Sequence, residues 1–440
     1  MQSVIKLEHI WLCTKDFCEH EAIPKDIKVL VLTDAFMIAG DEQYQNTQEG
    51  TVQAFCAWAD GGFVWVPSRK EFFIYETKDY DPKLQTWGGV WHSEERFYWL
   101  QETFDEEIYK GASLLEQKYF ELPKEEQQIL NGFLARIHKK QITISNMDHK
   151  NFKKYVRKYS TEEIDFDNPF HNGKLINCRN GVFDLETMQF RSSRREDFLS
   201  YILPVTYDPA AETDTLWPFL DTIFCQNVER LEMTLGLLST ALDRTLLPKP
   251  ILLFYNPTHS FSGRNIFFSF LKNCLGSFTS IMYGSLVDEN HPYLENHTYN
   301  ISDKECVLPR IVAINEDFFP SNRGWEEIAY MGSGEDVSFH SYGKPLVSGP
   351  ADILTILKTD NLPKLKAPAL DNLYVIPFEW SALGKPALFT SEAKFYTDTL
   401  KSRVLNLLIE SYQQWIEGKI EIPYEYRQLA KRCFEEGDHT

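Results

Sequence analysis

Hydrophobic and polar positions divide the chain into segments of different periodicity. In residues 1–64, short apolar runs such as IKVLVLTDAFMIAG and TVQAFCAWAD alternate with polar turns, which predicts a small β-rich element. From Gly61 to Trp91 the runs are again strand-like. Three residues that disfavour strands interrupt them: Pro67, Pro82 and Gly88. Both segments are therefore expected to consist mainly of β-strands.

Helical periodicity begins where these strands end. Apolar residues recur at helical spacing from Glu95 to Tyr119 and from Pro123 to Lys140, which predicts the start of a mainly α-helical region. A β-hairpin is predicted further on, because Asn180-Gly181 is a strong two-residue turn signal between the apolar runs of KLINCRNGVFDLETMQFR. Residues 65–214 are therefore expected to form a mainly α domain with β-hairpins.

The next part of the chain alternates strands and helices. LLFYNPTHSFSGRNIFFSFLKNCLG has the pattern of an apolar strand, a polar loop closed by a glycine, and an amphipathic helix. The apolar runs RIVAIN, ILTILKT and LYVIPF follow, separated by helical or loop pieces, which is typical of an α/β domain. We expect such a core over residues 215–390 and a helical segment over residues 391–440. Three residues of the core should lie on neighbouring strands of one sheet: Phe254, Ile314 and Ile356.

The composition is that of a folded globular chain. Its 440 residues are 43% hydrophobic and 14% aromatic, which is enough for two or three packed domains. No apolar run approaches the roughly 18 residues of a membrane helix, and MQSVIKLEHIW lacks the basic flank and apolar stretch of a signal peptide. These features predict a cytoplasmic protein without a membrane segment.

Eight cysteines without a CxxC pair are scattered along the chain. This usage predicts buried free thiols in a reducing compartment and no disulfide framework. HIWLCTKDFCEH holds four residues of the types that bind zinc: His9, Cys13, Cys18 and His20. Their spacing matches no common zinc finger and Cys13 lies in an apolar stretch, so structural thiols and surface histidines are the expected interpretation.

The formal net charge of −19 at pH 7 disfavours a protein that coats nucleic acid with its whole surface. Any such contact must be local. The candidate is the segment ARIHKKQITISNMDHKNFKKYVRKY, whose cations are Arg136, Lys139, Lys140, Lys150, Lys153, Lys154, Arg157 and Lys158. The same pattern is typical of a solvated basic helix face in an acidic protein, and both interpretations stay open.

The segment from Leu252 to Gly276 has the layout of a nucleotide-binding P-loop. In such a loop, backbone N–H groups and a helix N-terminus hold the phosphates, a lysine reaches the β- and γ-phosphates, and a Ser or Thr hydroxyl holds Mg²⁺. Here Gly263 is in place, but Arg264 stands at the lysine position and Asn265 at the hydroxyl position. The layout is retained, while the chemistry is altered.

Several segments together resemble the motifs of one family, in the right order. They are FFIYETKDYDPKLQTWGGVWH, LINCRNGVFDLET, YILPVTYDPAAETDTLWPFL and LLIESYQQWIEGKIEIP. The family is that of the superfamily 3 helicases found at the C-terminal end of phage and plasmid primase-helicases, including the poxvirus-type primase-helicase. The resemblance covers residues 65–440. It implies an AAA+-like P-loop ATPase core at residues 215–390, preceded by a helicase-associated N-terminal domain at residues 65–214.

The resemblance also assigns roles to single residues. Asn256 replaces the first glycine of the P-loop, and the loop from Asn256 to Gly263 is two residues longer than GxxxxG. RIVAINED is similar to a Walker B strand and places Glu316 where a catalytic carboxylate polarises water and helps to position Mg²⁺. TILKTDNLPKL places Asn361 at the residue that orients the attacking water. YMGSGEDVSFHSYGKP is similar to a DNA-contacting hairpin, with Lys344 as a phosphate contact.

The strand sequence ALDNLYVIPF carries a further change. It resembles a family strand that begins with two arginines, yet Asp371 and Asn372 occupy those positions. The resemblance therefore implies that the arginine finger, which stabilises γ-phosphate charge in a neighbouring subunit, is missing. A catalytic primase domain is not expected either, because the roughly 60 residues before the resemblance are too few to hold one.

Two functions stay open. The first is a superfamily 3 helicase-like DNA replication protein of a phage, plasmid or other mobile element, which has little ATPase activity and forms a homo- or hetero-oligomeric ring on DNA. The alternative is a catalytically inactive helicase-fold scaffold or DNA-binding regulator of an active helicase or primase partner. ATP and Mg²⁺ are the implied cofactors, with binding weakened or lost. The residues implied to hold them are Asn256, Gly263, Arg264 and Asn265, with Asn265 and Glu316 at the metal.

Overall fold

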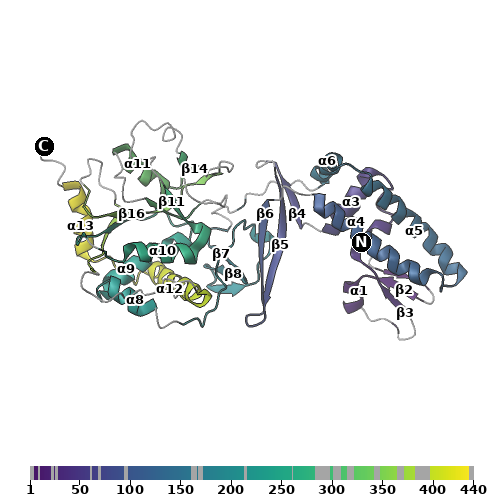
Figure 1. The fold of residues 1–440 in the computed structure, drawn as a ribbon, viewed down its shortest axis with the longest axis horizontal. Helices are drawn as coiled ribbons and strands as arrows, with labels where there is room; N and C mark the ends of the chain where they lie inside the picture. The colour runs from purple at the N-terminus through teal and green to yellow at the C-terminus, as the bar shows by residue number, and fades with distance from the viewer. Residues whose placement is uncertain are drawn as a thin grey trace. The chain divides into compact units, whose positions relative to one another are not determined.

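The computed structural model of the chain (Figure 1) describes most of its residues. They are residues 4–7, 10–20, 24, 28–59, 62–67, 71–93, 98–159, 166, 172–212, 216–259, 261–282, 298–300, 309–314, 322–340, 347–363, 371–381 and 397–435. The chain forms two compact units. The first comprises Met1–Glu76 and Trp91–Ile164, and the second comprises Thr77–Val90 and Asp165–Thr440.

The N-terminal part of the first unit combines a small sheet with helices. The sheet contains β1 (Val4–Lys6), β2 (Ile10–Cys13) and β3 (Lys28–Val31), in that order. The helices are α1 (Lys15–His20), α2 (Asp34–Gly40) and α3 (Gln48–Ala59). The predicted β-rich character is therefore wrong for the apolar runs that form α2 and α3.

The packing of α2 and α3 explains this error. Phe36 of α2 and Phe55 of α3 are fully buried, and each contacts an aromatic ring of a longer helix, Phe133 at 5.5 Å and Phe104 at 5.5 Å between centroids. A short apolar run buried on all sides has the same composition in a strand and in a helix, so its periodicity does not distinguish them. Thr33 decides the first case by capping α2, since its hydroxyl accepts a hydrogen bond from the backbone N–H of Phe36.

A disulfide joins Cys13, the last residue of β2, to Cys18 in α1. It corrects the expectation that the cysteines are free thiols, which holds for Cys56, Cys178, Cys225, Cys274 and Cys433. Because α1 begins directly after β2, its first turn brings the two Cα atoms to 6.7 Å. Within the described ranges, no group of three or more His, Cys, Asp or Glu side chains is arranged to hold a metal ion.

Three longer helices complete the first unit: α4 (Tyr98–Tyr119), α5 (Lys124–Ser145) and α6 (His149–Tyr159). The first two confirm the predicted helices. Their apolar faces enclose one core with α2 and α3, which includes Ile108, Leu130 and Ile137. A three-stranded sheet follows the order β4 (Phe63–Val66), β5 (Glu71–Asp81) and β6 (Thr86–Ser93).

Gly88 was predicted to interrupt a strand, but it lies inside β6. A Cβ atom at this position would lie 1.9 Å from the carbonyl oxygen of Arg179. The glycine is therefore required by the close approach of another backbone segment and not by a turn. Pro67 and Pro82 do lie outside the strands.

The predicted hairpin around Asn180-Gly181 is present in the second unit. It belongs to an antiparallel sheet of β7 (Leu175–Cys178), β8 (Gly181–Asp184) and β9 (Gln189–Arg191). Cys178 pairs with Gly181, so the turn consists of Arg179 and Asn180 and lies one residue earlier than predicted. The Asn180 side chain fixes this turn because it donates to the carbonyl of Tyr207 at 2.9 Å and accepts from its N–H at 2.8 Å.

The core of the second unit is a parallel five-stranded sheet with the order β11-β13-β16-β10-β17. These strands are β10 (Ile251–Tyr255), β11 (Thr279–Met282), β13 (Ile311–Ile314), β16 (Leu354–Thr359) and β17 (Leu373–Pro377). The sheet confirms the α/β fold class. Phe254, Ile314 and Ile356 lie on the neighbouring strands β10, β13 and β16, as predicted.

Helices pack on both faces of this sheet. They are α8 (Leu216–Ile223), α9 (Val228–Ser239), α10 (Arg264–Leu275), α11 (Asn322–Met331), α12 (Asp398–Ile416) and α13 (Tyr424–Glu435). Phe254 and Phe267 belong to one apolar core with α9, α10 and α12, while Leu253 and Ile328 belong to another with α11 and α13. Short 3₁₀ helices are η1 (Arg195–Asp197), η2 (Thr240–Leu242) and η3 (Gly276–Phe278).

A second small sheet has the order β12 (Thr298–Asn300), β14 (Asp336–His340) and β15 (Val347–Pro350). β14 and β15 pair antiparallel, which gives the hairpin expected in this region, whereas its tip with Lys344 lies outside the described residues. In the part of the chain that the structure describes, no helix combines the length and the apolar character needed to cross a membrane.

The predicted domain boundaries at residues 64, 214 and 390 do not coincide with the two compact units. Residues before position 64 share a core with α4 and α5. Leu175 and Leu203, on one side of residue 214, share another core with Leu252 and with Leu405 of α12. The borders of these units are determined by packing between residues that are distant in the sequence. Local changes in composition along the chain do not reveal them.

Candidate functional site

The P-loop-like segment starts at the carboxyl end of β10, which lies between β16 and β17 in the sheet. The chain leaves this strand at Tyr255 and enters α10 at Arg264. Gly263 is the N-cap of α10 and has a left-handed backbone with φ 79°. A Cβ atom there would also lie 2.6 Å from Ile223 of α8, so both conformation and space require glycine. The predicted strand, loop and helix are thus all present.

Arg264, at the position of a P-loop lysine, is buried with 5% of its surface exposed. Its Nη1 donates to the carbonyl oxygens of Thr359 at 2.6 Å and Phe254 at 3.3 Å, near the carboxyl ends of β16 and β10. Its Nη2 forms an ion pair with the Asp360 carboxylate at 2.8 Å. The guanidinium is therefore bound to its own fold.

Asn256 closes the loop on the same carboxylate. Its side-chain Nδ2 donates to Asp360 Oδ1 at 3.0 Å, and its Oδ1 accepts from the hydroxyl of Thr258 at 2.8 Å. Its backbone N–H donates to the carbonyl of Thr359 at 2.9 Å. The residue that replaces the first P-loop glycine thus ties the loop to the end of β16.

Asn265 and Asn361 lie at the edge of this arrangement. Asn265 Oδ1 accepts a hydrogen bond from the Lys358 ammonium at 3.0 Å, so the oxygen that could bind Mg²⁺ already has a cationic partner. Asn361 is exposed, and its backbone N–H donates to Thr359 Oγ1 at 3.0 Å while its carbonyl accepts from the same hydroxyl at 2.6 Å. Glu316, the predicted catalytic carboxylate, lies outside the described residues.

The structure brings Asn256 and Arg264 together around Asp360, which the sequence analysis did not single out. The available signal was chemical. An arginine buried at the start of a helix requires a counter-ion, and Asp360 follows the strand that pairs with β10. A carboxylate is also the type of group that the N-terminus of a helix favours. Here the chain itself supplies the anion.

Asn372, at one of the two predicted arginine positions, lies at the amino end of β17. Its Nδ2 donates to the carbonyl of Lys249 at 2.7 Å, and its own carbonyl accepts from the N–H of Ile251 at 2.9 Å. This end of the sheet is opposite to the P-loop-like loop. Asn372 thus acts as a link between the amino ends of β10 and β17.

The basic surface is centred on α6 in the first unit. Phe152 and Val156 bury one side of the helix, while Lys150, Lys154, Arg157 and Lys158 are exposed and Lys153 is half-buried. The guanidinium of Arg157 lies 3.9 Å from the centre of the Trp65 ring. Lys158 forms an ion pair with Glu49. This helix keeps the four predicted cations of residues 153–158 on one short element.

Two cations of the predicted patch have structural partners instead. Lys140 is fully buried and donates to Asn46 at 3.2 Å, and burial lowers its pKa to about 8. Arg136 donates to the carbonyl of Gly40 at 2.9 Å and forms an ion pair with Glu42 at 3.0 Å. Lys140 lies on the face of α5 that also carries the buried Ile137 and Ile144. Its predicted contribution to DNA binding is therefore wrong.

Comparison with known proteins gives one family match. Residues 70–225 match the family described as D5 N terminal like. This segment is a little over a third of the chain and overlaps the predicted helicase-associated domain at residues 65–214. No curated protein matches the chain.

Among solved structures, the chain is similar to two forms of one protein region. The apo structure of the NrS-1 C terminal region (305–718) is 13% identical with a TM-score of 0.39, and the alignment covers 53% of this chain and 54% of that one. The A form apo structure of the NrS-1 C terminal region is 12% identical with a TM-score of 0.41, covering 82% and 72%. The chain thus spans about half the length of the first of these structures.

Proposed function

We propose that this chain is a DNA-binding replication protein of a phage, plasmid or other mobile element, of the superfamily 3 primase-helicase type, in which the P-loop-like site is structural and turns over little or no ATP. Three observations support the proposal. They are the D5 N-terminal-like match, the strand, loop and helix at the centre of a parallel sheet, and the exposed cations of α6.

The state of Arg264 carries the proposal. A P-loop lysine is a flexible point charge that reaches toward a bound phosphate, whereas Arg264 is fixed by two strand-end carbonyls and by Asp360. A phosphate that took its place at the guanidinium would have to displace this carboxylate. The displaced Asp360 is 40% exposed and would regain water, so this exchange costs roughly 1 kcal/mol, the scale of a partly exposed ion pair.

This cost is a modest part of the free energy of nucleotide binding, since dissociation constants of about 1 mM to 1 μM correspond to about 4 to 8 kcal/mol. Two further changes weaken binding: no mobile lysine reaches the phosphates, and the oxygen of the neutral Asn265 already accepts from Lys358. The missing arginine finger would act on the rate of hydrolysis.

The basic face of α6 supports the DNA-binding part. A helix of 11 residues that exposes Lys150, Lys154 and Arg157, beside the Lys158 that pairs with Glu49, provides a local positive surface on a chain with a net charge of −19. Phosphate contacts of this kind do not depend on nucleic-acid sequence. In this proposal, the protein acts on DNA in an oligomeric ring, alone or with an active helicase or primase partner.

A working ATPase with an altered P-loop is the second candidate. The position of the loop favours it, because ligands of open parallel sheets bind at the carboxyl ends of the strands where the connections diverge. β10 is such a strand, with its connection to α10 and the later strands β16 and β17 on its two sides. Gly263 also keeps the backbone conformation at the start of α10.

Calorimetric titration of the full chain with Mg·ATP tests the proposal. We expect no saturable heat up to roughly 1 mM nucleotide, since the guanidinium is already neutralised, and an unchanged affinity for single-stranded DNA when Mg·ATP is added. Saturable binding in the micromolar range that is lost in Arg264→Ala would contradict the structural role of the site and favour the second candidate.

A further inference from the structure

The tip of the hairpin formed by β5 and β6, which belongs to the second unit, carries two exposed aromatic rings. Tyr80 is 45% exposed and Trp87 is 50% exposed. Their ring centroids are 4.7 Å apart with an angle of 41° between the planes. Aromatic side chains normally bury most of their large apolar surface, and these two rings leave about half of theirs in contact with solvent. This exposed pair therefore forms an apolar surface of two rings that are tilted against each other.

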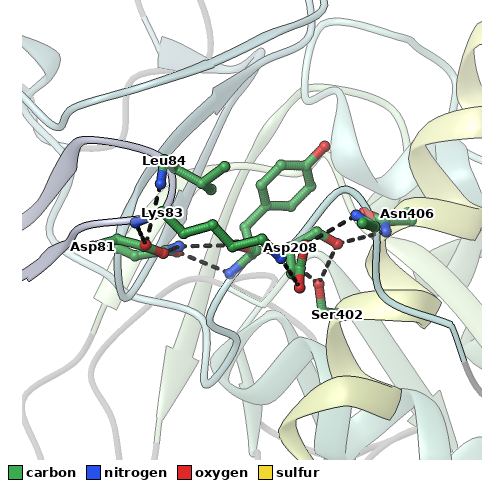
Figure 2. A network of polar contacts seen from close by, with 9 residues as sticks. Asp81, Lys83, Leu84, Asp208, Ser402 and Asn406 are labelled. Carbon is green, nitrogen blue, oxygen red and sulfur yellow. Dashed lines mark hydrogen bonds and ion pairs between the residues drawn. The ribbon is translucent and has the colours of Figure 1, made fainter.

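The hairpin tip is held in place by a polar network that Figure 2 shows. The Asp81 carboxylate accepts from the backbone N–H groups of Lys83 at 2.9 Å and Leu84 at 3.3 Å, and from Asn180 Nδ2 at 2.7 Å. The Lys83 ammonium forms an ion pair with Asp208 at 2.7 Å. Each contact fixes the turn that joins the two aromatic residues.

Asp208 is in turn bound to α12. Its backbone N–H donates to the Ser402 hydroxyl at 2.7 Å, and its carbonyl accepts from Asn406 Nδ2 at 2.9 Å (Figure 2). The network connects the tip of the hairpin to a helix of the α/β core. The two rings are thus presented on a fixed support, which lowers the entropy that a ligand would have to remove on binding.

Two arginines lie on segments whose backbone contacts β6 near Trp87. The Ser193 N–H donates to the Trp87 carbonyl at 2.8 Å, and Arg194 is the next residue. A Cβ atom on Gly88, the residue after Trp87, would lie 1.9 Å from the carbonyl oxygen of Arg179. Arg179 and Arg194 are both exposed. Across the residues that the structure describes, neither guanidinium has a hydrogen-bond or ion-pair partner.

The carboxylates near the tip do not neutralise these arginines, because Asp81 and Asp208 already have the partners described above. The surface therefore combines two rings in tilted contact with the positive charges of two exposed arginines. A planar apolar ligand with a regular negative charge matches both features. Nucleic-acid bases and phosphates have this chemistry, and the bases are free to stack on side chains only when the strand is single.

We infer that the tip of the β5–β6 hairpin binds single-stranded nucleic acid, with bases stacked on Trp87 and Tyr80 and phosphates bound by Arg179 and Arg194. The inference rests on the proposed function and adds a second contact, separate from the basic face of α6. Stacking of this kind is independent of base sequence, so the site binds the strand without selecting it.

Fluorescence anisotropy of the full chain with a labelled oligothymidylate of about 20 nucleotides tests the inference. Trp87→Ala should raise the dissociation constant about 5- to 100-fold, the effect of losing one stacking partner, and leave its salt dependence unchanged. Trp87→Phe should retain most of the affinity. Replacement of both arginines by alanine should lower the slope of log K against log salt by about 1.4, or about 0.7 for each lost phosphate contact.

Trp217→Ala is the matched control, because Trp217 is also an exposed tryptophan of the second unit but lies in α8. It should leave binding unchanged. If the hairpin variants bind like the wild type while Lys154→Ala with Arg157→Ala in α6 weakens binding, the inference is wrong and the proposed function stands. If the wild type does not bind the oligonucleotide, both are wrong. If Trp87→Ala changes only the oligomeric state in sedimentation, the rings form a protein contact and the inference is again overturned.

Discussion

At the scale of single residues, Arg264 shows how one substitution changes the role of a loop. Its guanidinium connects the ends of β10 and β16 through two carbonyls and connects the P-loop-like segment to Asp360. A lysine at this position has one ammonium and cannot make these contacts with the same fork geometry. The substitution therefore has a structural explanation that does not require a nucleotide.

Replacing Arg264 by methionine should destabilise the second unit. The change keeps most of the side-chain volume but removes the guanidinium from two carbonyls and from Asp360, while Asn256 still donates to Thr359 and Asp360. We therefore expect a loss of about 1–3 kcal/mol in the free energy of unfolding. Urea denaturation measures it. The control is Lys358→Met, which removes the cation of the residue before Thr359 in β16. This substitution should lower the free energy of unfolding by less than about 0.5 kcal/mol. An Arg264→Met protein as stable as the wild type would show that the inward contacts of Arg264 are not important for the fold.

Lys249 lies in the segment that joins η2 to β10, and its side chain is fully buried. Its ammonium donates to the carbonyl of Thr240 at 2.6 Å and to that of Asp243. Burial lowers the pKa of Lys249 from 10.5 to about 7. Between these two pH values the unfolded chain binds more protons than the folded chain, so the contribution of Lys249 to stability rises as the pH rises from about 7.

The measurement compares the unfolding free energies of the wild type and Lys249→Met from pH 7 to about pH 9. The difference between them should shift in favour of the wild type as the pH rises. A difference that stays constant over this range would mean that the ammonium keeps its proton in the folded state. The same series on Lys401→Met, a lysine with an exposed partner in α12, provides the control.

At the scale of elements, the apolar runs predicted strands and helices wherever length or flanking signals decided between them. β10, α10, β13, β16 and β17 follow this rule, because each run ends at a polar or glycine-containing loop. The apolar run of α3 did not, since its buried residues reflect packing against α4 that the local sequence does not contain. The same limit hid Asp360, whose importance depends on the pairing of β10 with β16.

The element-scale prediction is that α6 binds DNA through its exposed cations. Lys154→Ala with Arg157→Ala should raise the dissociation constant for single-stranded DNA at least about 10-fold at low salt and lower the salt slope by about 1.4, since two phosphate contacts are lost. The matched control is Lys110→Ala with Lys118→Ala in α4, where both lysines pair with acids of the same region. An equal effect of the two pairs would mean that net charge, and not the face of α6, determines binding.

At the scale of the whole molecule, the chain forms two units whose borders do not follow the sequence. Residues 77–90 belong to the second unit. In the hairpin tip, Asp81 accepts a hydrogen bond from Asn180 and Lys83 forms an ion pair with Asp208. Composition and net charge describe neither this packing nor the position of the basic surfaces. The order of motifs did predict the α/β core, and residues 70–225, which match the D5 N terminal like family, lie within the predicted resemblance. Both depend on patterns that are local in sequence.

We propose that the α/β core holds a P-loop-like site without ATP turnover. The decisive measurement is the rate of ATP hydrolysis by the wild type and by Glu316→Gln, each with and without single-stranded DNA. We expect little hydrolysis and no difference between the two proteins, because the cation of the site is bound to Asp360; a contaminating ATPase would also be unaffected by the substitution. Hydrolysis by the wild type that Glu316→Gln abolishes would instead identify the altered loop as a working ATPase.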